Sequence, residues 1–216
     1  MIQLLIALAL FIFFAPFVEE IRGGDLIVSV LLSLVLISAV FAVASRRSTL
    51  IIALLLAIPA LVGRWINYFR PELVPPAVFL TAGLVLIAFV VANLLRFVLG
   101  APSVNADVLC ASISAYLMLG LLWTLAYWLV DQLNQEAFSF NMTTGTKETM
   151  AGFNAFYFSF ITLSTVGYGD ITPVSKVARM LAATEAITGL LYVAVLIARL
   201  VGLYSTPDST PKSHDS

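Results

Sequence analysis

The run from Thr165 to Asp170, with the sequence TVGYGD, has residue types and spacing that could hold an ion. A cation that enters a narrow pore loses its water shell, and backbone carbonyl oxygens can replace that shell. Successive carbonyls point toward one axis only where the backbone alternates between ordinary and left-handed conformations. Glycine adopts the left-handed conformation at little steric cost. Gly167 and Gly169 stand at alternate positions, so the run fits ion coordination by the backbone.

The segments that flank this run could position it. Phe153 to Ser164 is apolar but too short to cross a membrane, whereas Val177 to Tyr204 is long enough. We therefore expect a short re-entrant helix before the run and a transmembrane helix after it. The C-terminal end of the short helix would carry partial negative charge, which favours a cation in front of it.

The composition predicts a membrane protein. The chain has 216 residues, of which 61% are hydrophobic and 11% charged, and its mean hydropathy is +1.05. A helix needs roughly 20 mostly apolar residues to cross the hydrocarbon core. The third predicted span is short unless Trp65 to Phe69 extend it, and the first is expected to be a retained helix, because it lacks the basic start of a secretory signal. The predicted spans are Ile2 to Val18, Leu26 to Ala44, Thr49 to Gly63, Pro76 to Leu95, Val108 to Val130 and Val177 to Tyr204.

The TVGYGD run resembles the filter signature of the tetrameric potassium channel superfamily and matches it without a substitution. The resemblance implies that K⁺ is the transported ion and that no organic cofactor is needed. It implies K⁺ sites made by the carbonyls of Thr165, Val166, Gly167 and Tyr168 and by the Thr165 hydroxyl, with Gly169 completing the filter. Val166 and Tyr168 would point away from the axis and pack behind it. Because one chain supplies one strand of a ring of four, a homotetramer or a mixed tetramer is implied.

Two departures from the family pattern lie in the expected re-entrant helix. Many members of the superfamily have a tryptophan pair where this chain has Tyr157 and Phe158, and some have a glutamate where it has Ile161. Without that glutamate, the bonding of Asp170 behind the filter would rest on Tyr157. We therefore expect Asp170 and Tyr157 to support the filter.

The expected fold class is an all-α membrane protein with six transmembrane helices and a re-entrant pore helix and filter loop between the fifth and the sixth. Residues 1–104 would form a four-helix transmembrane domain that resembles a voltage-sensor domain but lacks its charges. Residues 105–204 would form the pore domain, and 205–216 a disordered cytoplasmic tail. Steep voltage dependence needs about 3 to 4 gating charges per subunit. The fourth span has none within it, so we predict little intrinsic voltage gating.

Two residues of the last span are candidates for gating. Gly189 lies where members of this superfamily often have a bending glycine, but a packing role is equally compatible with the sequence. Glu185, one turn earlier, is a carboxyl group within a membrane helix, where such groups are costly and often functional. Its alternative is a structural hydrogen bond to a neighbouring helix, through Thr184 or Thr188. Arg199 is expected to extend to the inner membrane surface.

Other functions fit less well. Scattered basic residues argue against nucleic-acid binding, and the spans show no paired carboxylates, histidine cluster or nucleophile with a base, so we do not expect an enzyme. No soluble ligand-binding domain is expected. We expect a multi-pass protein of the cell membrane, and the filter orientation predicts both termini in the cytoplasm. The compact loops and the lack of a cytoplasmic domain favour a prokaryotic type. The alternatives left open are a weakly selective cation channel and a non-conducting or regulatory membrane subunit; a potassium uptake protein with four filter loops would need repeats that this chain lacks.

Overall fold

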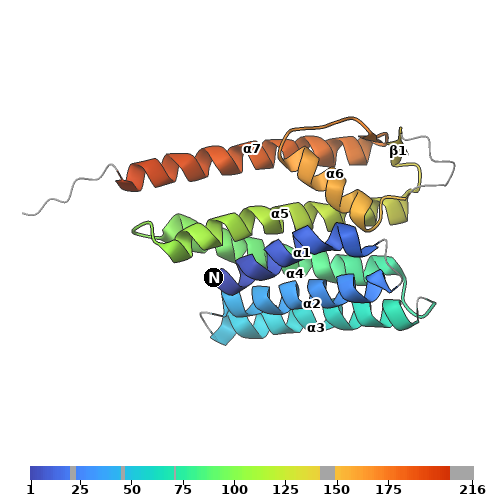
Figure 1. Cartoon of the computed structure of the whole chain (residues 1–216), viewed down its shortest axis with the longest axis horizontal. Helices are drawn as coiled ribbons and strands as arrows, with labels where there is room; N and C mark the ends of the chain where they lie inside the picture. Colours follow the sequence, from blue (N-terminus) through green and yellow to red (C-terminus); the bar gives the residue numbers. More distant parts are fainter. Residues whose placement is uncertain (20–22, 45–46, 71, 142–148, 205–216) are drawn as a thin grey trace, which may run out of the picture.

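The computed structural model describes residues 1–19, 23–44, 47–70, 72–141 and 149–204. In this part of the chain, long helices run side by side, and a short tilted helix, α6, lies between α5 and α7 (Figure 1). The predicted tail, 205–216, lies outside the described residues. The helices are α1 (Ile2–Glu19), α2 (Gly24–Val43), α3 (Arg47–Phe69), α4 (Pro76–Gly100), α5 (Ala106–Leu133), α6 (Phe153–Leu163) and α7 (Lys176–Tyr204), and the strands are β1 (Phe138–Phe140) and β2 (Ile171–Pro173).

Every predicted span is a helix, and α3 continues to Phe69, so the expected extension of the third span is confirmed. Among the described residues, five helices are long and apolar enough to cross a membrane: α2, α3, α4, α5 and α7. The apolar part of α1, Ile2–Val18, is shorter. At 1.5 Å per residue, α1 is about 27 Å long, slightly less than the hydrocarbon core of about 30 Å. A sixth span therefore stays a prediction.

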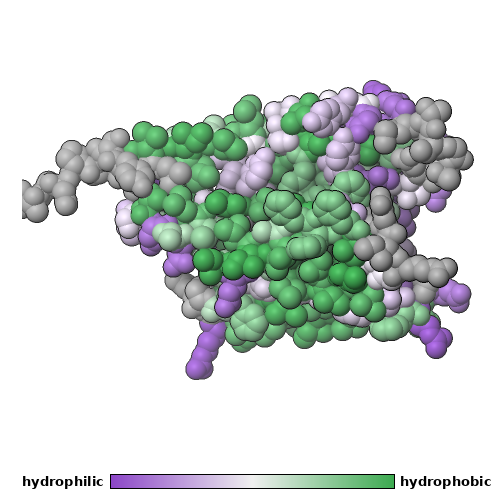
Figure 2. Space-filling view, in the orientation of Figure 1, coloured by the Kyte–Doolittle hydropathy of each residue, from purple (hydrophilic) through white to green (hydrophobic). Residues whose placement is uncertain are grey.

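The first helix is apolar on both its buried and its exposed sides. Its buried residues include Leu4, Leu8 and Phe11, which share one helix face toward the bundle. Its outward side is also apolar, with Phe13 and Phe17 each 73% exposed. A helix that is apolar all round suits a lipid environment. In agreement, Figure 2 shows hydrophobic residues across the middle of the visible face and hydrophilic residues toward the two ends of the helices.

A two-stranded sheet follows α5 and was not expected from the sequence. Strands β1 and β2 are antiparallel, with Phe138 opposite Pro173 and Phe140 opposite Ile171. Because β2 begins directly after the TVGYGD run, the sheet joins the end of that run to the loop that follows α5.

Buried apolar residues form two cores. The larger core joins α1 to α5 and reaches Leu163, the last residue of α6. The smaller core lies where α5, α6, α7 and the sheet meet, and its aromatic members include Tyr127, Phe138 and Phe158. The rings of Tyr127 and Phe158 are 4.9 Å apart in an edge-to-face arrangement. The smaller core thus lies beside the C-terminal end of the TVGYGD run, where Ile171 follows Asp170.

Candidate filter and the helices behind it

The backbone turns sharply where α6 ends and the candidate filter, residues 165–170, begins. The amide of Thr165 donates to the Thr162 carbonyl at 2.9 Å. The amides of Val166 and Gly167 both donate to the carbonyl of Ile161, at 2.9 and 3.2 Å. These N–H groups therefore face back toward the helix end. Within the described part of the chain, no hydrogen bond reaches the carbonyl oxygens of residues 165–168, so none of the described residues donates to them.

Backbone conformation alternates along the candidate filter. Thr165, Gly167 and Gly169 have φ angles of 59°, 54° and 81°, in the left-handed region, whereas Val166 and Tyr168 do not have positive φ. A Cβ atom added to Gly167 or Gly169 would meet nothing within 4 Å. Glycine is therefore favoured at these two positions by conformation and not by lack of space. Thr165 adopts the same region as an ordinary L-residue, which is uncommon.

The side chains of Val166 and Tyr168 are largely exposed in the described part of the single chain. Val166 is 53% exposed and Tyr168 is 72% exposed. Their predicted packing behind the filter stays a prediction.

Asp170 is held from two sides. The Tyr157 hydroxyl donates to Asp170 Oδ2 at 2.6 Å, and the amide of Ile171 donates to Oδ1 at 3.0 Å. The hydrogen bond to Asp170, followed by burial and by the negative charge of Asp170, raises the pKa of Tyr157 to about 12. The phenol therefore keeps its proton and remains a donor throughout the neutral range. Tyr157 and Asp170, predicted to act together, lie in direct contact.

Asn141 is a contact that the sequence did not reveal. Its side-chain amide donates to the Gly169 carbonyl at 2.8 Å, and its backbone amide donates to the Asp170 carbonyl at 2.8 Å. Asn141 follows β1 and lies 28 residues from Gly169 in sequence. No local pattern could have indicated this pairing, because it follows from the register of the sheet. The loop after α5 thereby holds the C-terminal end of the candidate filter.

Glu185 is fully buried where α5, α6 and α7 meet. Its carboxyl group accepts a hydrogen bond from the hydroxyl of Tyr127 on α5, and its Oε1 lies 2.6 Å from Ser159 Oγ on α6. The predicted route through Thr184 or Thr188 is wrong, because both hydroxyls donate to carbonyls of their own helix. The hydrogen bonds of Glu185 thus join three helices, as the structural alternative expected, but through other residues.

Gly189 lies against the end of α6. A Cβ atom at this position would overlap the carbonyl oxygen of Leu163 and lie 3.0 Å from its carbonyl carbon. Gly189 therefore permits a close approach of α7 to the base of the candidate filter. Bending of α7 at Gly189 is not tested by this contact and stays a prediction.

Arg199 binds α4, and its predicted extension to the inner membrane surface stays a prediction. Its Nη2 donates to the Ala101 carbonyl at 2.7 Å, and its Nε donates to the Val98 carbonyl at 3.4 Å. These carbonyls lie at the C-terminal end of α4, where partial negative charge favours a cation. Arg199 thus links the far end of α7 to the first four helices.

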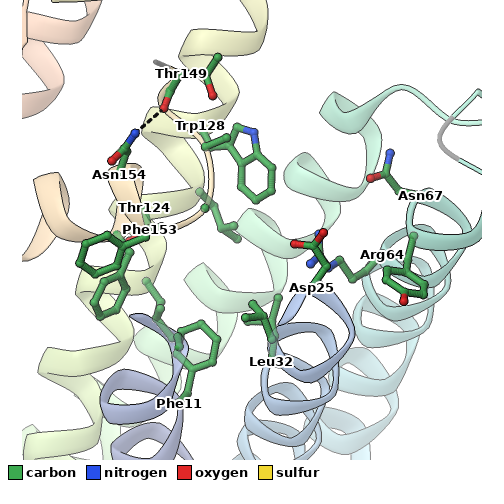
Figure 3. Close-up of a pocket in the computed structure, with 18 of the residues that line it drawn as sticks. Phe11, Asp25, Leu32, Arg64, Asn67, Thr124, Trp128, Thr149, Phe153 and Asn154 are labelled. Carbon is green, nitrogen blue, oxygen red and sulfur yellow. Dashed lines mark hydrogen bonds between the residues drawn. The ribbon is translucent and has the colours of Figure 1, made fainter. Parts of the chain in front are cut away.

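A cavity of about 640 Å³ separates the first helices from the start of α6. Figure 3 shows Asp25 and Arg64 on one side, and Thr149 and Asn154 on the other, where the Asn154 amide donates to the Thr149 carbonyl at 3.0 Å. The Arg64 guanidinium lies 6.0 Å from the ring centre of Phe79. Among the described residues that line the cavity, the charged side chains are one cation, Arg64, and one anion, Asp25, which together carry no net charge.

Comparisons with known proteins find ion channels. The model of the ion channel family matches residues 116–205. Over 71 residues, or 29% of this chain and 17% of the relative, the chain is 41% identical to the voltage-gated potassium channel Kch of Escherichia coli. It is 43% identical over 54 residues to two-pore potassium channel 4 of Arabidopsis thaliana, covering 25% of this chain and 19% of the relative.

A third relative is covered over most of its length. Protein LctB of Bacillus caldotenax is 30% identical over 98 residues, which are 45% of this chain and 72% of that protein. By contrast, the chain spans about a fifth of the length of the two potassium channels above. No solved structure matches the chain. The matched family and the relatives that the chain resembles are ion channels and not enzymes, which supports the prediction of a non-enzymatic protein.

Proposed function

The chain belongs to the potassium channel superfamily and is a multi-pass membrane protein, and from this premise we propose that four copies of it form a pore that conducts K⁺ passively and selectively. The K⁺ sites are the carbonyls of Thr165, Val166, Gly167 and Tyr168 and the Thr165 hydroxyl, with Gly169 at the outer end. The observation that carries the proposal is the alternation of left-handed φ angles along residues 165–169.

This alternation has a direct chemical consequence. Neighbouring residues in conformations of opposite hand can turn successive carbonyl oxygens toward the same side, where they replace the water of a bare K⁺ ion. The N–H groups of the first filter residues face the end of α6 instead. The C-terminal end of α6 adds partial negative charge beside the entering cation. Both features lower the cost of removing water from K⁺ without a charged side chain at the ion.

Exposure of α7 supports a homotetramer. In the membrane-spanning window of this helix, 11% of the residues are buried, compared with 56% in α5. Apolar side chains such as Met180, Ile187 and Leu190 are each more than half exposed. Copies of the same chain around a central axis would cover these side chains, together with the exposed Val166 and Tyr168, and would supply the other three strands of the filter.

The proposed location of the channel is the cell membrane. Its topology has six spans, with α1 as the first and both termini in the cytoplasm. Residues 1–104 form a four-helix domain and 105–204 the pore domain. The side chain of Arg96, near the end of α4, is exposed, and no other charge lies in that helix. The channel is therefore not gated by voltage through its first four helices.

Flux measurements on the purified full chain in liposomes test this function. We expect K⁺ flux that Ba²⁺ blocks and that greatly exceeds Na⁺ flux. Gly167→Ala places a side chain at a left-handed φ angle and should abolish K⁺ selectivity. Gly100→Ala, where an added Cβ meets nothing within 4 Å, is the matched control and should leave flux unchanged. Equal K⁺ and Na⁺ flux would favour a weakly selective channel, and a folded tetramer without flux would favour a non-conducting subunit.

A further inference from the structure

We propose that Glu185 carries a proton in the folded protein and, as a neutral acid, is the positioning residue that fixes the pore helix α6 and the inner helix α7 to α5. The effect of this residue on conduction rests on the proposed channel function. The presence of the proton does not, because it follows from burial and from a count of hydrogen atoms.

Among the described residues, no cation interacts with Glu185. The residue is 0% exposed, and its direct hydrogen-bond partners are two neutral hydroxyl groups, those of Tyr127 and Ser159. Within the described part of the chain, no salt bridge reaches its carboxyl group. Within the described residues, the titratable side chains that interact electrostatically with it are Tyr127 and Tyr116, both on α5. An ionised carboxylate without a cation is costly in such a place, both inside proteins and at membrane depth.

Ser159 shows where the proton is. Its Oγ lies 2.6 Å from Glu185 Oε1 and 2.8 Å from the Gly120 carbonyl oxygen, but a serine hydroxyl has one hydrogen to donate. If Glu185 were ionised, one of these two short oxygen–oxygen contacts would contain no hydrogen. This arrangement would place two acceptors against each other in a buried site, at the full cost of an unmade bond.

A single added proton satisfies the whole cluster. With the proton on Oε1, Glu185 donates to Ser159 Oγ, and Ser159 donates to the Gly120 carbonyl. The hydroxyl of Tyr127 donates to the other carboxyl oxygen. Each hydroxyl hydrogen and each short contact then has its partner. The result is a neutral chain of hydrogen bonds that runs from α5 through α7 to α6 and back to α5.

The position of this chain gives it a mechanical role. One turn beyond Glu185, Gly189 packs against the carbonyl of Leu163, directly before the candidate filter. α7 is therefore held to α6 by the hydrogen bond of Glu185 and by close packing at Gly189. Hydrogen bonds fix distances and angles, whereas apolar contacts in a membrane permit sliding. Loss of the Glu185 bonds should let α6 shift and should loosen the base of the filter.

Infrared spectroscopy of the full-length tetramer in lipid tests the proton directly. A protonated carboxyl group has a C=O stretching band that a carboxylate lacks. We expect this band at neutral pH in the parent protein and its loss in Glu185→Gln. The matched control is Glu136→Gln, because Glu136 is an exposed side chain, and the band should remain. A parent spectrum without the band, or a band unchanged in Glu185→Gln, would overturn the proposal.

Conduction tests the positioning role. Glu185→Gln can donate to Ser159 and accept from Tyr127, so K⁺ flux and selectivity should stay within about twofold of the parent. Tyr127→Phe keeps the ring but removes one bond, and Ser159→Ala removes another. Each of these two substitutions should lower K⁺ flux or selectivity roughly tenfold, which is the factor expected for the loss of one buried hydrogen bond.

The outcomes separate this inference from the proposed function. A folded Glu185→Gln tetramer that loses flux while Tyr127→Phe retains it would overturn the positioning role. A parent protein that shows the infrared band but conducts no K⁺ would contradict the channel proposal and leave the protonated acid in place.

Discussion

The first four helices and the last three are held together by different forces. Between α2 and α3, the Trp65 indole donates to Ser33 Oγ at 3.3 Å, Asp25 lies near Arg64 beside the cavity, and their buried core contacts are apolar. Around α7, by contrast, Glu185 bonds to two helices, and the Tyr192 hydroxyl donates to the Ser112 carbonyl of α5 at 2.5 Å.

The two regions differ in how precisely their helices must be positioned. Lipid tails are as apolar as leucine, so apolar helix contacts in a membrane give little resistance to sliding. Hydrogen bonds between buried groups fix a geometry, because breaking them leaves polar atoms without a partner. Carbonyl oxygens that replace a water shell must keep their positions. The polar cross-links are concentrated where the proposed filter needs them.

The largest effect should come from Gly189→Ala, which adds a Cβ atom where α7 packs closely against α6. The added Cβ would overlap the Leu163 carbonyl oxygen, which is backbone and cannot move aside easily. We expect the tetramer to melt at a clearly lower temperature and K⁺ flux to fall by more than about tenfold, since overpacking costs about 1–3 kcal/mol. Melting followed by gel filtration, together with liposome flux, measures both.

Gly202→Ala on the same helix is the control, because its Cβ would meet nothing within 4 Å. A Gly189→Ala tetramer that melts like the parent but opens less often would instead support bending at this glycine, with the close contact being incidental.

A smaller effect is expected from Tyr157→Phe, which removes the hydrogen bond to Asp170. Asp170 would retain the amide of Ile171 but lose its side-chain donor. We expect the conducting filter to be less stable, so that K⁺ currents in a planar bilayer decline several-fold faster during a long recording. Tyr68→Phe, in the first four helices, should leave the decline unchanged. Equal rates in all three proteins would show that Asp170 does not need Tyr157.

The same contrast explains how much the sequence could predict. The spans and the TVGYGD run could be predicted because hydropathy and glycine spacing are local properties of the sequence. In the same way, α3 ends at Phe69, as its interfacial aromatic residues indicated. The contacts that fix the filter region are not local. Tyr127 and Glu185 are 58 residues apart, and Asn141 and Gly169 are 28 apart. Their pairing depends on how helices and the sheet pack, which no periodicity records.

Gly189 and Glu185 illustrate the limit in detail. The sequence allowed either bending or packing at Gly189, and the neighbouring Leu163 carbonyl became visible only with α6 in place. For Glu185, a structural hydrogen bond was expected, but the partners came from α5 and α6 and not from adjacent threonines. A residue's own helix is predictable from sequence, whereas its neighbours across the bundle are not.

Arg199→Gln should have an intermediate effect, because it weakens the polar link between the two regions. Glutamine is shorter and neutral, so it would lose the contacts with the Val98 and Ala101 carbonyls and the interaction with the helix end. We expect K⁺ flux to change about two- to fivefold, the range for one charged hydrogen bond at a partly exposed site, with selectivity unchanged. Arg96→Gln, an exposed residue on α4, is the control. A loss of selectivity in Arg199→Gln would mean that the inner end of α7 acts on the filter itself.

The smallest effect should come from Trp65→Phe, which removes the hydrogen bond between α3 and α2. The bond is long, at 3.3 Å, and phenylalanine keeps much of the ring packing, so the loss should be below about 1 kcal/mol. We expect the melting temperature and K⁺ flux to match the parent within error. Tyr127→Phe is the counterpart, because it removes one hydroxyl bond from the filter region and should lower flux roughly tenfold. If the two substitutions had equal effects, hydrogen bonds between helices would matter as much in the first four helices as around α7. The proposed difference between the two regions would then be wrong.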